Sequence, residues 1–153
     1  MPDTDPQVVK LQEWIEVSMD RSIRDFIRYS RESGLSISQL GALFHIHRRG
    51  SSGVTDLGDH LGVTSPAASQ MLERLVQQDL ILRSVDPSDR RVKQIVLTAK
   101  GLQVLHESIR ARQMWLYDVA ESLSNPEKKT MIAALNVLID KAQHTGQPIE
   151  PDR

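Results

Sequence analysis

Basic side chains gather in one short stretch of an otherwise nearly neutral chain. Between residues 83 and 100 the basic residues are Arg83, Arg90, Arg91, Lys93 and Lys100, and the acidic ones are Asp86 and Asp89. Guanidinium and ammonium groups form charge-assisted hydrogen bonds with phosphate oxygens, so this stretch is a candidate for contacts with a nucleic-acid backbone. A solvated surface hairpin would have the same composition, and the neighbouring elements must decide between the two interpretations.

The overall charge limits the kind of nucleic-acid partner. The 153 residues carry a formal net charge of -1 at pH 7. Proteins that coat nucleic acid without regard to sequence usually carry a large basic excess. The charge therefore argues against such a protein and leaves open a site-specific binder, which needs only a local basic patch.

The bulk composition predicts one compact domain. Hydrophobic residues make up 39% of the chain and charged residues 25%, as in ordinary globular proteins. The N-terminus has no signal-peptide pattern, and no apolar run approaches the roughly 18 residues that a membrane span needs. We expect a cytoplasmic protein with no membrane partner.

The five histidines raise the question of a metal site. His45 and His47 are two residues apart in a predicted helix and therefore point to different faces. His60 and His106 complete no set with ligand spacing, and the chain has no cysteine for zinc, disulfide or thiol redox chemistry. We expect neither a metal nor another cofactor, and we interpret His45 as a pocket or core histidine.

Catalytic motifs are also missing from the sequence. It contains no nucleophile elbow, no Gly-rich phosphate loop, no H-E-x-x-H pair and no paired-carboxylate signature at strand ends. We therefore do not expect an enzyme.

Apolar spacing predicts two helices in the first third of the chain. One covers residues 8–31, and its apolar stripe contains Leu11, Ile15, Met19, Ile23 and Phe26. Ser36 and Gln39 have the spacing of a capping box, which predicts a second helix that Gly50 ends.

Two short helices and a hairpin are predicted next. Thr55 is expected to cap the first of these helices, and Ser65 to cap the other, with Pro66 at its first helical position. After Leu80 the apolar pattern becomes nearly alternating, which predicts a β-hairpin over residues 81–97 with a D-P-S-D turn.

The last third is predicted to be helical. Thr98 should cap one long helix whose apolar side contains Leu102, Leu105, Ile109, Leu116 and Val119. The run S124-N-P-E has the form of a capping box and predicts a final helix, and the Pro-rich and charged tail after Gly146 is expected to be disordered.

The order helix, tight turn, helix and hairpin is that of a winged helix-turn-helix. Its second helix can enter the major groove of DNA, and an Arg at the hairpin tip can reach the adjacent minor groove. The relevant runs are T55-D-L-G-D-H-L-G-V-T-S-P-A-A-S-Q-M-L-E-R-L, D79-L-I-L-R, D86-P-S-D-R-R-V and L97-T-A-K-G. With these runs, residues 36–105 resemble the MarR family of transcriptional regulators.

The resemblance implies a mainly α fold with a small β-hairpin wing (α+β). It also implies a regulator that binds double-stranded DNA sequence-specifically, as a ligand-responsive repressor and homodimer on an inverted-repeat operator. Within a single domain over 1–153, we expect an N-terminal dimerisation helix (8–31), a DNA-binding lobe (36–97), C-terminal dimerisation helices (98–145) and a flexible tail (146–153). The alternative is a winged-helix-shaped protein-interaction or ligand-binding dimer that does not bind DNA.

The resemblance also assigns roles to single residues. Facing the groove would be Ser65, Ala67, Ser69 and Gln70. Gln70 stands where many relatives have Arg, and its carboxamide matches an adenine edge better than a guanine edge. Arg74 would touch the DNA backbone or brace the wing. At the wing, the implied contacts come from Asp89, which orients Arg91 toward the minor groove, and from Arg90 and Lys93.

Two further features follow from the resemblance. Asp79 stands where relatives usually have Gly at a left-handed helix end, a conformation that Asp tolerates better than most residues. Relatives often respond to a small aromatic or phenolic anion in a crevice between the dimerisation helices and the DNA-binding lobe. The candidate lining residues here are Trp14, Phe44, His45, Met114, Trp115 and Tyr117.

Overall fold

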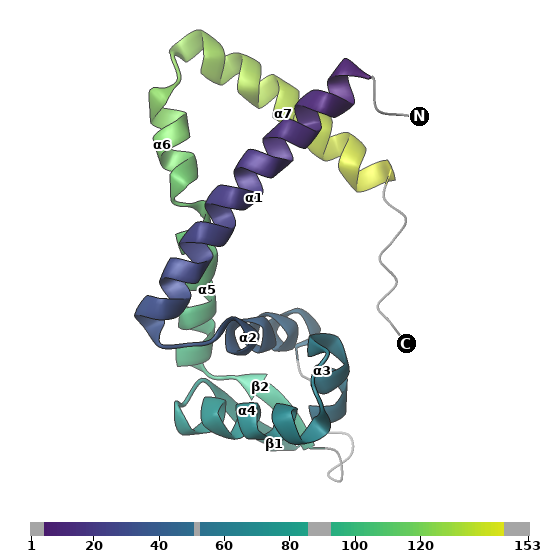
Figure 1. The fold of residues 1–153 in the computed structure, drawn as a ribbon, viewed down its shortest axis with the longest axis vertical. Coiled ribbons are helices and arrows are strands. Elements are labelled where there is room, and N and C mark those ends of the chain that lie inside the picture. The colour runs from purple at the N-terminus through teal and green to yellow at the C-terminus, as the bar shows by residue number, and fades with distance from the viewer. Residues whose placement is uncertain (1–4, 51–52, 86–92, 146–153) are drawn as a thin grey trace. The chain divides into compact units, whose positions relative to one another are not determined.

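The computed structural model describes residues 5–50, 53–85 and 93–145, with the backbone alone for residues 54, 55, 85, 93 and 145 (Figure 1). The chain forms two compact units, Met1–Gln113 and Met114–Arg153. In the described residues the first unit contains five helices and a two-stranded hairpin, and the second contains two helices. This mainly helical architecture with one small hairpin confirms the predicted fold class.

Helix α1 (Pro6–Ser33) is the long amphipathic helix that the apolar stripe predicts. Its first turn is capped by the Asp5 carboxylate, which accepts a hydrogen bond from the Gln7 amide at 3.0 Å. It ends at Gly34, whose φ of 69° lies in the left-handed region that glycine adopts without strain. The helix therefore extends about two residues beyond each predicted end.

Helix α1 packs along helix α5 (Ala99–Gln113) within the first unit (Figure 1). The Tyr29 hydroxyl of α1 donates a hydrogen bond to the Val104 carbonyl at 3.1 Å and lies 3.3 Å from the Glu107 carboxylate. Partial burial, followed by the charge of Glu107, raises the pKa of Tyr29 to about 12. Tyr29 therefore stays a protonated donor that links the two helices.

Helix α2 (Ile37–Arg49) begins with the predicted capping box. The Gln39 amide donates to the Ser36 hydroxyl at 3.2 Å, and the Gln39 side-chain Oε1 accepts from the Ser36 amide at 2.8 Å. Gly50 ends the helix with a φ of 75°, as predicted. Both ends of α2 are thus readable from the sequence.

The caps of the next two helices differ from the prediction. Helix α3 (Val54–Leu61) has Gly53 as its N-cap, so Thr55 lies inside the first turn and does not cap it. Helix α4 (Ser65–Gln77) is capped by Thr64, whose hydroxyl accepts from the Ala67 amide, so Ser65 is already helical. The first turn tolerates Pro66 there because its amides need no helical acceptor.

Helix α4 ends in a Schellman motif at Asp79. The Leu80 amide donates to the Leu75 carbonyl and the Asp79 amide to the Val76 carbonyl, both at 2.9 Å. Asp79 has a φ of 59°, the predicted left-handed conformation at a non-glycine residue. This reversal directs the chain from α4 into the first strand.

Strands β1 (Ile81–Val85) and β2 (Lys93–Leu97) form the predicted antiparallel hairpin, with Ile81 opposite Leu97 and Arg83 opposite Ile95. Ile81 and Ile95 are buried, whereas Leu82 and Arg83 are exposed. The inward isoleucines fix the register, since a slip of one residue would turn them outward.

The prediction of one long helix after Thr98 is wrong, because the helix is interrupted at Met114. Thr98 does cap α5, by accepting a hydrogen bond from the Gly101 amide at 2.9 Å. The helix stops at Gln113, and helix α6 (Trp115–Ser122) starts after Met114. Met114 keeps helical angles of φ -56° and ψ -39°, so the break lies in the hydrogen-bond pattern, where the Tyr117 amide donates to the Met114 carbonyl.

Helix α7 (Asn125–Thr145) begins where the S124-N-P-E run predicts it. The Glu127 carboxylate accepts from the Ser124 amide at 2.8 Å and from its hydroxyl at 2.6 Å. These hydrogen bonds lower the pKa of Glu127. The predicted tail over 146–153 lies outside the described residues.

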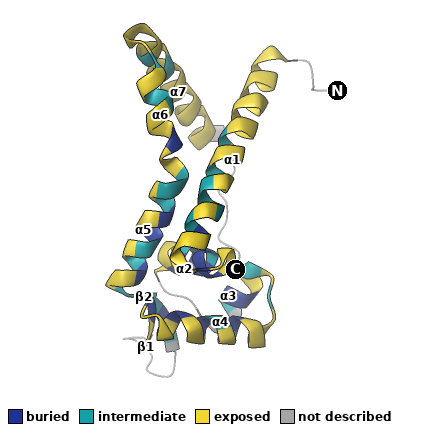
Figure 2. Ribbon diagram, turned by 60° about the vertical axis from the view of Figure 1, so that its left-hand side comes forward, coloured by how far each residue is buried: buried dark blue, intermediate teal, exposed yellow. Residues whose placement is uncertain are grey.

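The buried side chains of the first unit concentrate around α2, with α3, α4, the hairpin and α5 packed about them (Figure 2). The fully buried members are Leu40, Leu43, Ile46, Leu57, Leu72, Leu75 and Leu105. Most of α1 is exposed by contrast. The core therefore holds the helix-turn-helix rigid and presents the outer face of α4 to solvent.

Candidate nucleic-acid interface

Helix α4 buries one side and exposes the other. Ala68, Leu72 and Leu75 point into the core. Of the predicted groove-facing residues, Ser65, Ala67 and Gln70 are exposed and Ser69 is half-buried, and Arg74 is exposed as well. The first turns of α4 therefore carry small and polar side chains on a surface that a major groove can receive.

The predicted contact residues of α4 divide between two sides of the helix. Ala67, Gln70 and Arg74 recur at three- and four-residue steps and line one cavity of about 260 Å³. Ser65 and Ser69, four residues apart, share another side and do not line this cavity. The structure thus brings three of the five residues together and leaves two on the flank.

The opposite wall of this cavity comes from residues that the sequence analysis did not select. They are Ser36, Ser38 and Gln39 at the start of α2, with Val63 and Met71 completing the lining. A capping box was visible in the sequence, but its proximity to α4 is a tertiary feature. We call this space, with its eight lining residues, the α2–α4 cavity.

The wing is described only at its base. Asp89, Arg90 and Arg91, to which the family resemblance gives DNA contacts, lie outside the described residues. Lys93 pairs with Val85 at the outer end of the described hairpin, and its side chain is not described. The strands therefore establish where the hairpin extends from, directly after α4.

His45 joins α2 to α3. It is almost completely buried, and its Nε2 lies 2.9 Å from Oδ2 of Asp56 in α3. The Arg49 guanidinium lies 3.6 Å from the same carboxylate, and the His60 ring lies 4.1 Å from the His45 ring. This arrangement matches the interpretation of His45 as a core histidine.

Metal-binding geometry is absent from the part of the chain that the structure describes: it contains no group of three or more His, Cys, Asp or Glu side chains placed to hold an ion. His47 contacts His106 edge to face, with ring centroids 6.3 Å apart. Nor do the described helices include one that is long and apolar enough to cross a membrane.

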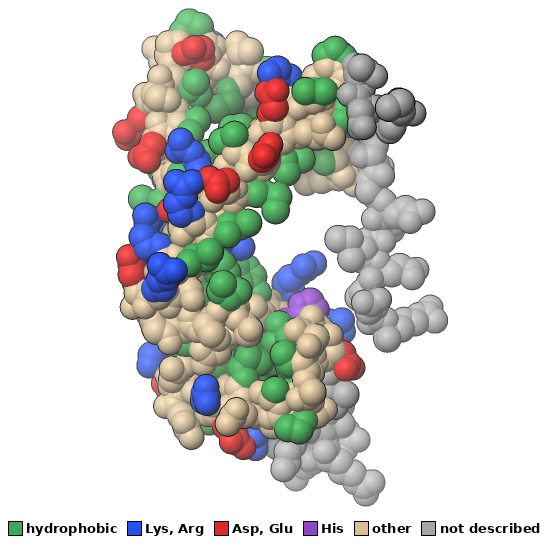
Figure 3. All heavy atoms as spheres, viewed as in Figure 1, with side chains coloured by type: hydrophobic (Ala, Val, Ile, Leu, Met, Phe, Trp, Pro, Cys, Tyr) green, Lys and Arg blue, Asp and Glu red, His purple; other side chains and the backbone are tan. Residues whose placement is uncertain are grey.

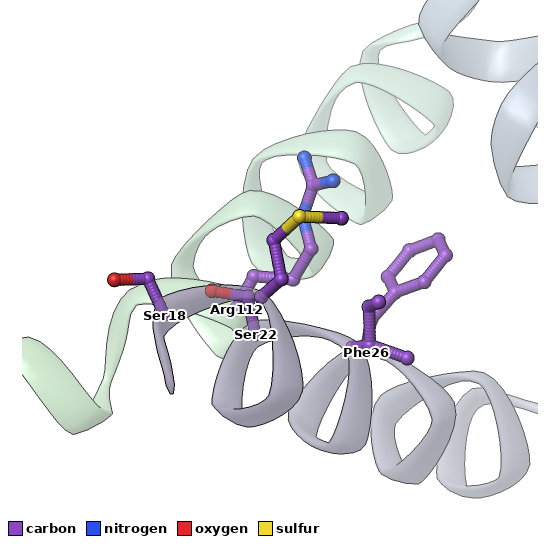
Figure 4. Close-up of a pocket in the computed structure, with 6 residues that line it drawn as sticks. Ser18, Ser22, Phe26 and Arg112 are labelled. Atoms are coloured by element: carbon purple, nitrogen blue, oxygen red, sulfur yellow. The ribbon is translucent and has the colours of Figure 1, made fainter. Parts of the chain in front are cut away.

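A second cavity, of about 290 Å³, lies between α1 and α5 (Figure 4). Its lining comprises Ser18, Met19, Ser22, Ile23, Phe26 and Arg112. The Arg112 guanidinium lies over two aromatic rings, 5.1 Å from the centroid of Phe26 and 4.8 Å from that of Phe44 in α2. We call this space the Arg112 cavity.

The residues predicted to line an effector crevice are scattered. Phe44 contacts Arg112, whereas His45 is committed to Asp56 and Trp14 is exposed on α1. Met114, Trp115 and Tyr117 belong to the second unit, at and after the break between α5 and α6. Arg112 was not predicted as a site residue, because it is one of two arginines in the last turn of an amphipathic helix and its spacing gives no signal of its own.

Comparison with known proteins places the central part of the chain in one family. Residues 35–93, from the residues just before α2 to the start of β2, match the model of the MarR family. The HTH-type transcriptional regulator MhqR of Bacillus subtilis (strain 168) is 27% identical over 88 residues, which span 57% of this chain and 61% of MhqR.

Solved structures have the same fold over nearly the whole chain. The transcriptional regulator Tm0710 from Thermotoga maritima has a TM-score of 0.75 at 22% identity and covers 93% of this chain and 99% of its own. A MepR mutant of S. aureus bound to an oligodeoxyribonucleotide has a TM-score of 0.65 at 21% identity. The match covers 87% of this chain and 97% of the MepR chain.

The fold likeness and the family match coincide on the helix-turn-helix and hairpin described above. The runs that start at Thr55, Asp79 and Leu97 adopt the expected elements, including the left-handed Asp79 at the end of α4, whereas the run over residues 86–92 lies outside the described residues. Residues 35–93 therefore match the MarR family, and the described fold is the same as that of the transcriptional regulator Tm0710.

Proposed function

We propose that the protein is a sequence-specific transcriptional regulator that binds double-stranded DNA. The observation that carries the proposal is the exposed face of α4, where small and polar side chains follow a capped first turn. A helix of this kind enters the major groove and reads base edges from its N-terminal half. The MepR structure with a bound oligodeoxyribonucleotide supports the proposal by fold.

Base reading is assigned to the exposed side of α4. The Gln70 carboxamide can donate to N7 and accept from N6 of adenine, and the Ala67 methyl group can contact a thymine methyl. Arg74 bonds to the backbone, and Ser65 and Ser69 contact the flank of the groove. From the wing, Arg90 and Arg91 enter the minor groove, with Asp89 orienting Arg91 and Lys93 meeting phosphate.

The regulator acts as a homodimer on an inverted repeat. Helices α1 and α7 each expose many apolar side chains, and the hydrophobic residues of α1 reach the surface along its length (Figure 3). A twofold partner would cover such faces. Two copies of α4 would then meet successive major grooves about 34 Å apart. The protein acts in the cytoplasm, where it reaches its operator.

The experiment is selection of bound sequences from random duplex DNA with the purified protein, alongside an Arg90→Ala/Arg91→Ala variant. We expect the wild type to enrich an inverted repeat, and the variant to lose enrichment. The slope of log affinity against log salt should also fall, by roughly 0.9 for each phosphate contact that the variant loses.

The controls separate DNA binding from folding. Arg24→Ala removes the same kind of charge from the exposed face of α1, far along the chain from the hairpin, and should enrich the wild-type repeat. Absence of any enrichment at low salt would overturn the proposal. It would favour a partner-binding or ligand-binding dimer that keeps only the winged-helix shape.

We assign the effector site of this repressor to the Arg112 cavity. Arg112 makes no ion pair within the described residues, and two aromatic rings hold its guanidinium in place. A carboxylate or phenolate next to this cation, with its ring against Met19 and Ile23, would match the lining. Such a ligand would release the operator only if it bound one dimer conformation better than the other.

Thermal unfolding with 2-hydroxybenzoate as the probe tests the site. We expect the melting temperature to rise with ligand concentration, and to rise much less with neutral benzyl alcohol. Arg112→Gln should abolish the rise, whereas Arg110→Gln, an exposed neighbour in α5, should retain it. Equal shifts for both variants would place the ligand elsewhere.

A further inference from the structure

The α2–α4 cavity has a lining of unusual polarity. Besides Arg74, four lining residues have side chains that form hydrogen bonds, namely Ser36, Ser38, Gln39 and Gln70. No acidic side chain lines it, and Val63, Ala67 and Met71 provide the apolar remainder. Its charge is therefore positive, and its ligand should be an anion with several acceptor oxygens.

Several polar side chains around the cavity have hydrogen-bond donors that no described residue accepts. In the described part of the chain, the side chains of Ser38, Gln70 and Arg74 make no hydrogen bond or ion pair. Arg74 is exposed at the edge of the cavity, where its guanidinium can bind two oxygens of one group. These donors are therefore available to bind a ligand from outside the chain.

Gln39 gives a second and independent indication. Its side chain is nine-tenths buried and its Oε1 is held by the Ser36 amide at 2.8 Å, which fixes the orientation of the carboxamide. The Nε2 group then has no acceptor among the described residues. Every fully buried side-chain nitrogen in the described residues has a hydrogen-bond partner. The Gln39 Nε2 has none, so it is not fully buried, and we infer that it is open to the cavity that Gln39 lines.

We propose that the α2–α4 cavity binds one phosphate of the operator backbone, through Arg74 from one wall and Ser38 and Gln39 from the other. This inference rests on the proposed DNA binding and extends it to α2, which has no assigned contact. Gln70 lines the same cavity, so a phosphate there fixes the register of the residue that reads adenine. Ser38 and Gln39 are thus positioning residues for sequence recognition.

A DNA source for the phosphate follows from the position of the cavity. Ala67 and Gln70 belong both to its lining and to the exposed face of α4. When α4 lies in the major groove, the adjacent strand of DNA must pass beside this face. A backbone phosphate therefore reaches the cavity without any change in the docking that the proposed function requires.

The test replaces single phosphates of the selected operator by uncharged methylphosphonates. We expect one position in each half-site to weaken wild-type binding about 10-fold. Arg74→Ala should weaken binding to the unmodified operator by a similar factor, and the methylphosphonate at that position should then have no further effect. Ser38→Ala should show the same coupling with a smaller factor of about 3.

Controls distinguish failure of the phosphate site from failure of the proposed DNA binding. Arg24→Ala should remain sensitive to the same methylphosphonate, since it lies on the exposed face of α1. If the wild type selects no operator, the proposed function itself fails. If it selects one and Arg74→Ala weakens binding without coupling to any backbone position, Arg74 supports the wing and the phosphate site is wrong.

Discussion

Gly101→Ala is expected to lower the free energy of unfolding by about 3 kcal/mol, and the melting temperature by about 10 °C. A Cβ at Gly101 would lie 1.9 Å from the carbonyl oxygen of Leu80 and 2.9 Å from its carbonyl carbon. These are backbone atoms that no change of rotamer can move. The gain in helix propensity from Ala is at most about 1 kcal/mol and does not offset this overlap.

The same contact lies next to the start of β1, at the base of the hairpin, so we expect the substitution to weaken the proposed DNA binding as well. The start of α5 is fastened to the end of α4 by three hydrogen bonds: from the Thr98 amide to the Leu80 carbonyl, the Thr98 hydroxyl to the Asp79 carbonyl, and Lys100 to the Gln78 carbonyl. The hairpin lies between these helices in the chain. Pushing α5 away from Leu80 therefore disturbs the base from which the wing extends.

Urea unfolding measures the effect, with Gly53→Ala as the matched control. A Cβ at Gly53 meets no atom within 4 Å, and its φ of -87° is open to alanine. That variant should lower the unfolding free energy by at most about 1 kcal/mol, since Ala is a poorer N-cap than Gly. A Gly101→Ala protein as stable as the Gly53→Ala protein would contradict the close approach of α5 to Leu80.

Capping chemistry shows both the reach and the limit of sequence reasoning in this fold. The capping box of Ser36 and Gln39 was predictable because both partners sit at a fixed spacing. At Thr64 and Ser65 two competent caps are adjacent, and Pro66 fits the first or the second helical position. The end of α3 decides between them: its reversal at Gly62 and Val63 places Thr64 as the cap.

The break between α5 and α6 was beyond the sequence signals. Residues 110–117 contain neither Gly nor Pro, and the apolar spacing continues from Ile109 to Leu116. Met114 keeps helical angles, so even its backbone conformation marks no end. The interruption is confined to hydrogen bonding, which composition and periodicity do not encode.

The candidate site was predictable where it follows the helical period and unpredictable where it depends on packing. The roles of Gln70 and Arg74 were predicted from the resemblance of this segment to the family, and the structure puts both on one cavity. Ser38 and Gln39 come from a helix about 30 residues earlier in the chain. Their contribution depends on how α2 crosses the core, and a single sequence does not specify that.

Ile15→Glu is expected to convert the proposed homodimer into a monomer at micromolar concentration and to abolish binding to the proposed operator. Ile15 is 54% exposed in the single chain and continues the apolar stripe with Leu11, Met19 and Ile23, which are also exposed. Burying a carboxylate in a twofold seam places two like charges near one another without a partner. We expect the dimer to weaken by about 100-fold or more, which corresponds to about 3 kcal/mol.

The substitution is chosen so that folding of the chain is retained. Glu is a better helix former than Ile, and Ile15 is not part of the core of the first unit. Arg24→Gln is the matched control, because it changes the net charge by the same amount on the opposite side of α1. Sedimentation velocity should find this control dimeric and Ile15→Glu monomeric, with the same helical content by circular dichroism.

The DNA-binding result then tests why a dimer is needed. In the proposed complex each α4 recognises only a half-site, so a monomer would lose the second set of contacts and the affinity that two linked sites provide. If Ile15→Glu remained dimeric, the α1 stripe would not be the seam, and the exposed apolar residues of α7 would be the next surface to substitute. These residues are Ile132, Leu135, Val137, Leu138 and Ile139 of α7. Replacing one of them by Glu should leave the helix folded, because all of them are exposed in the single chain.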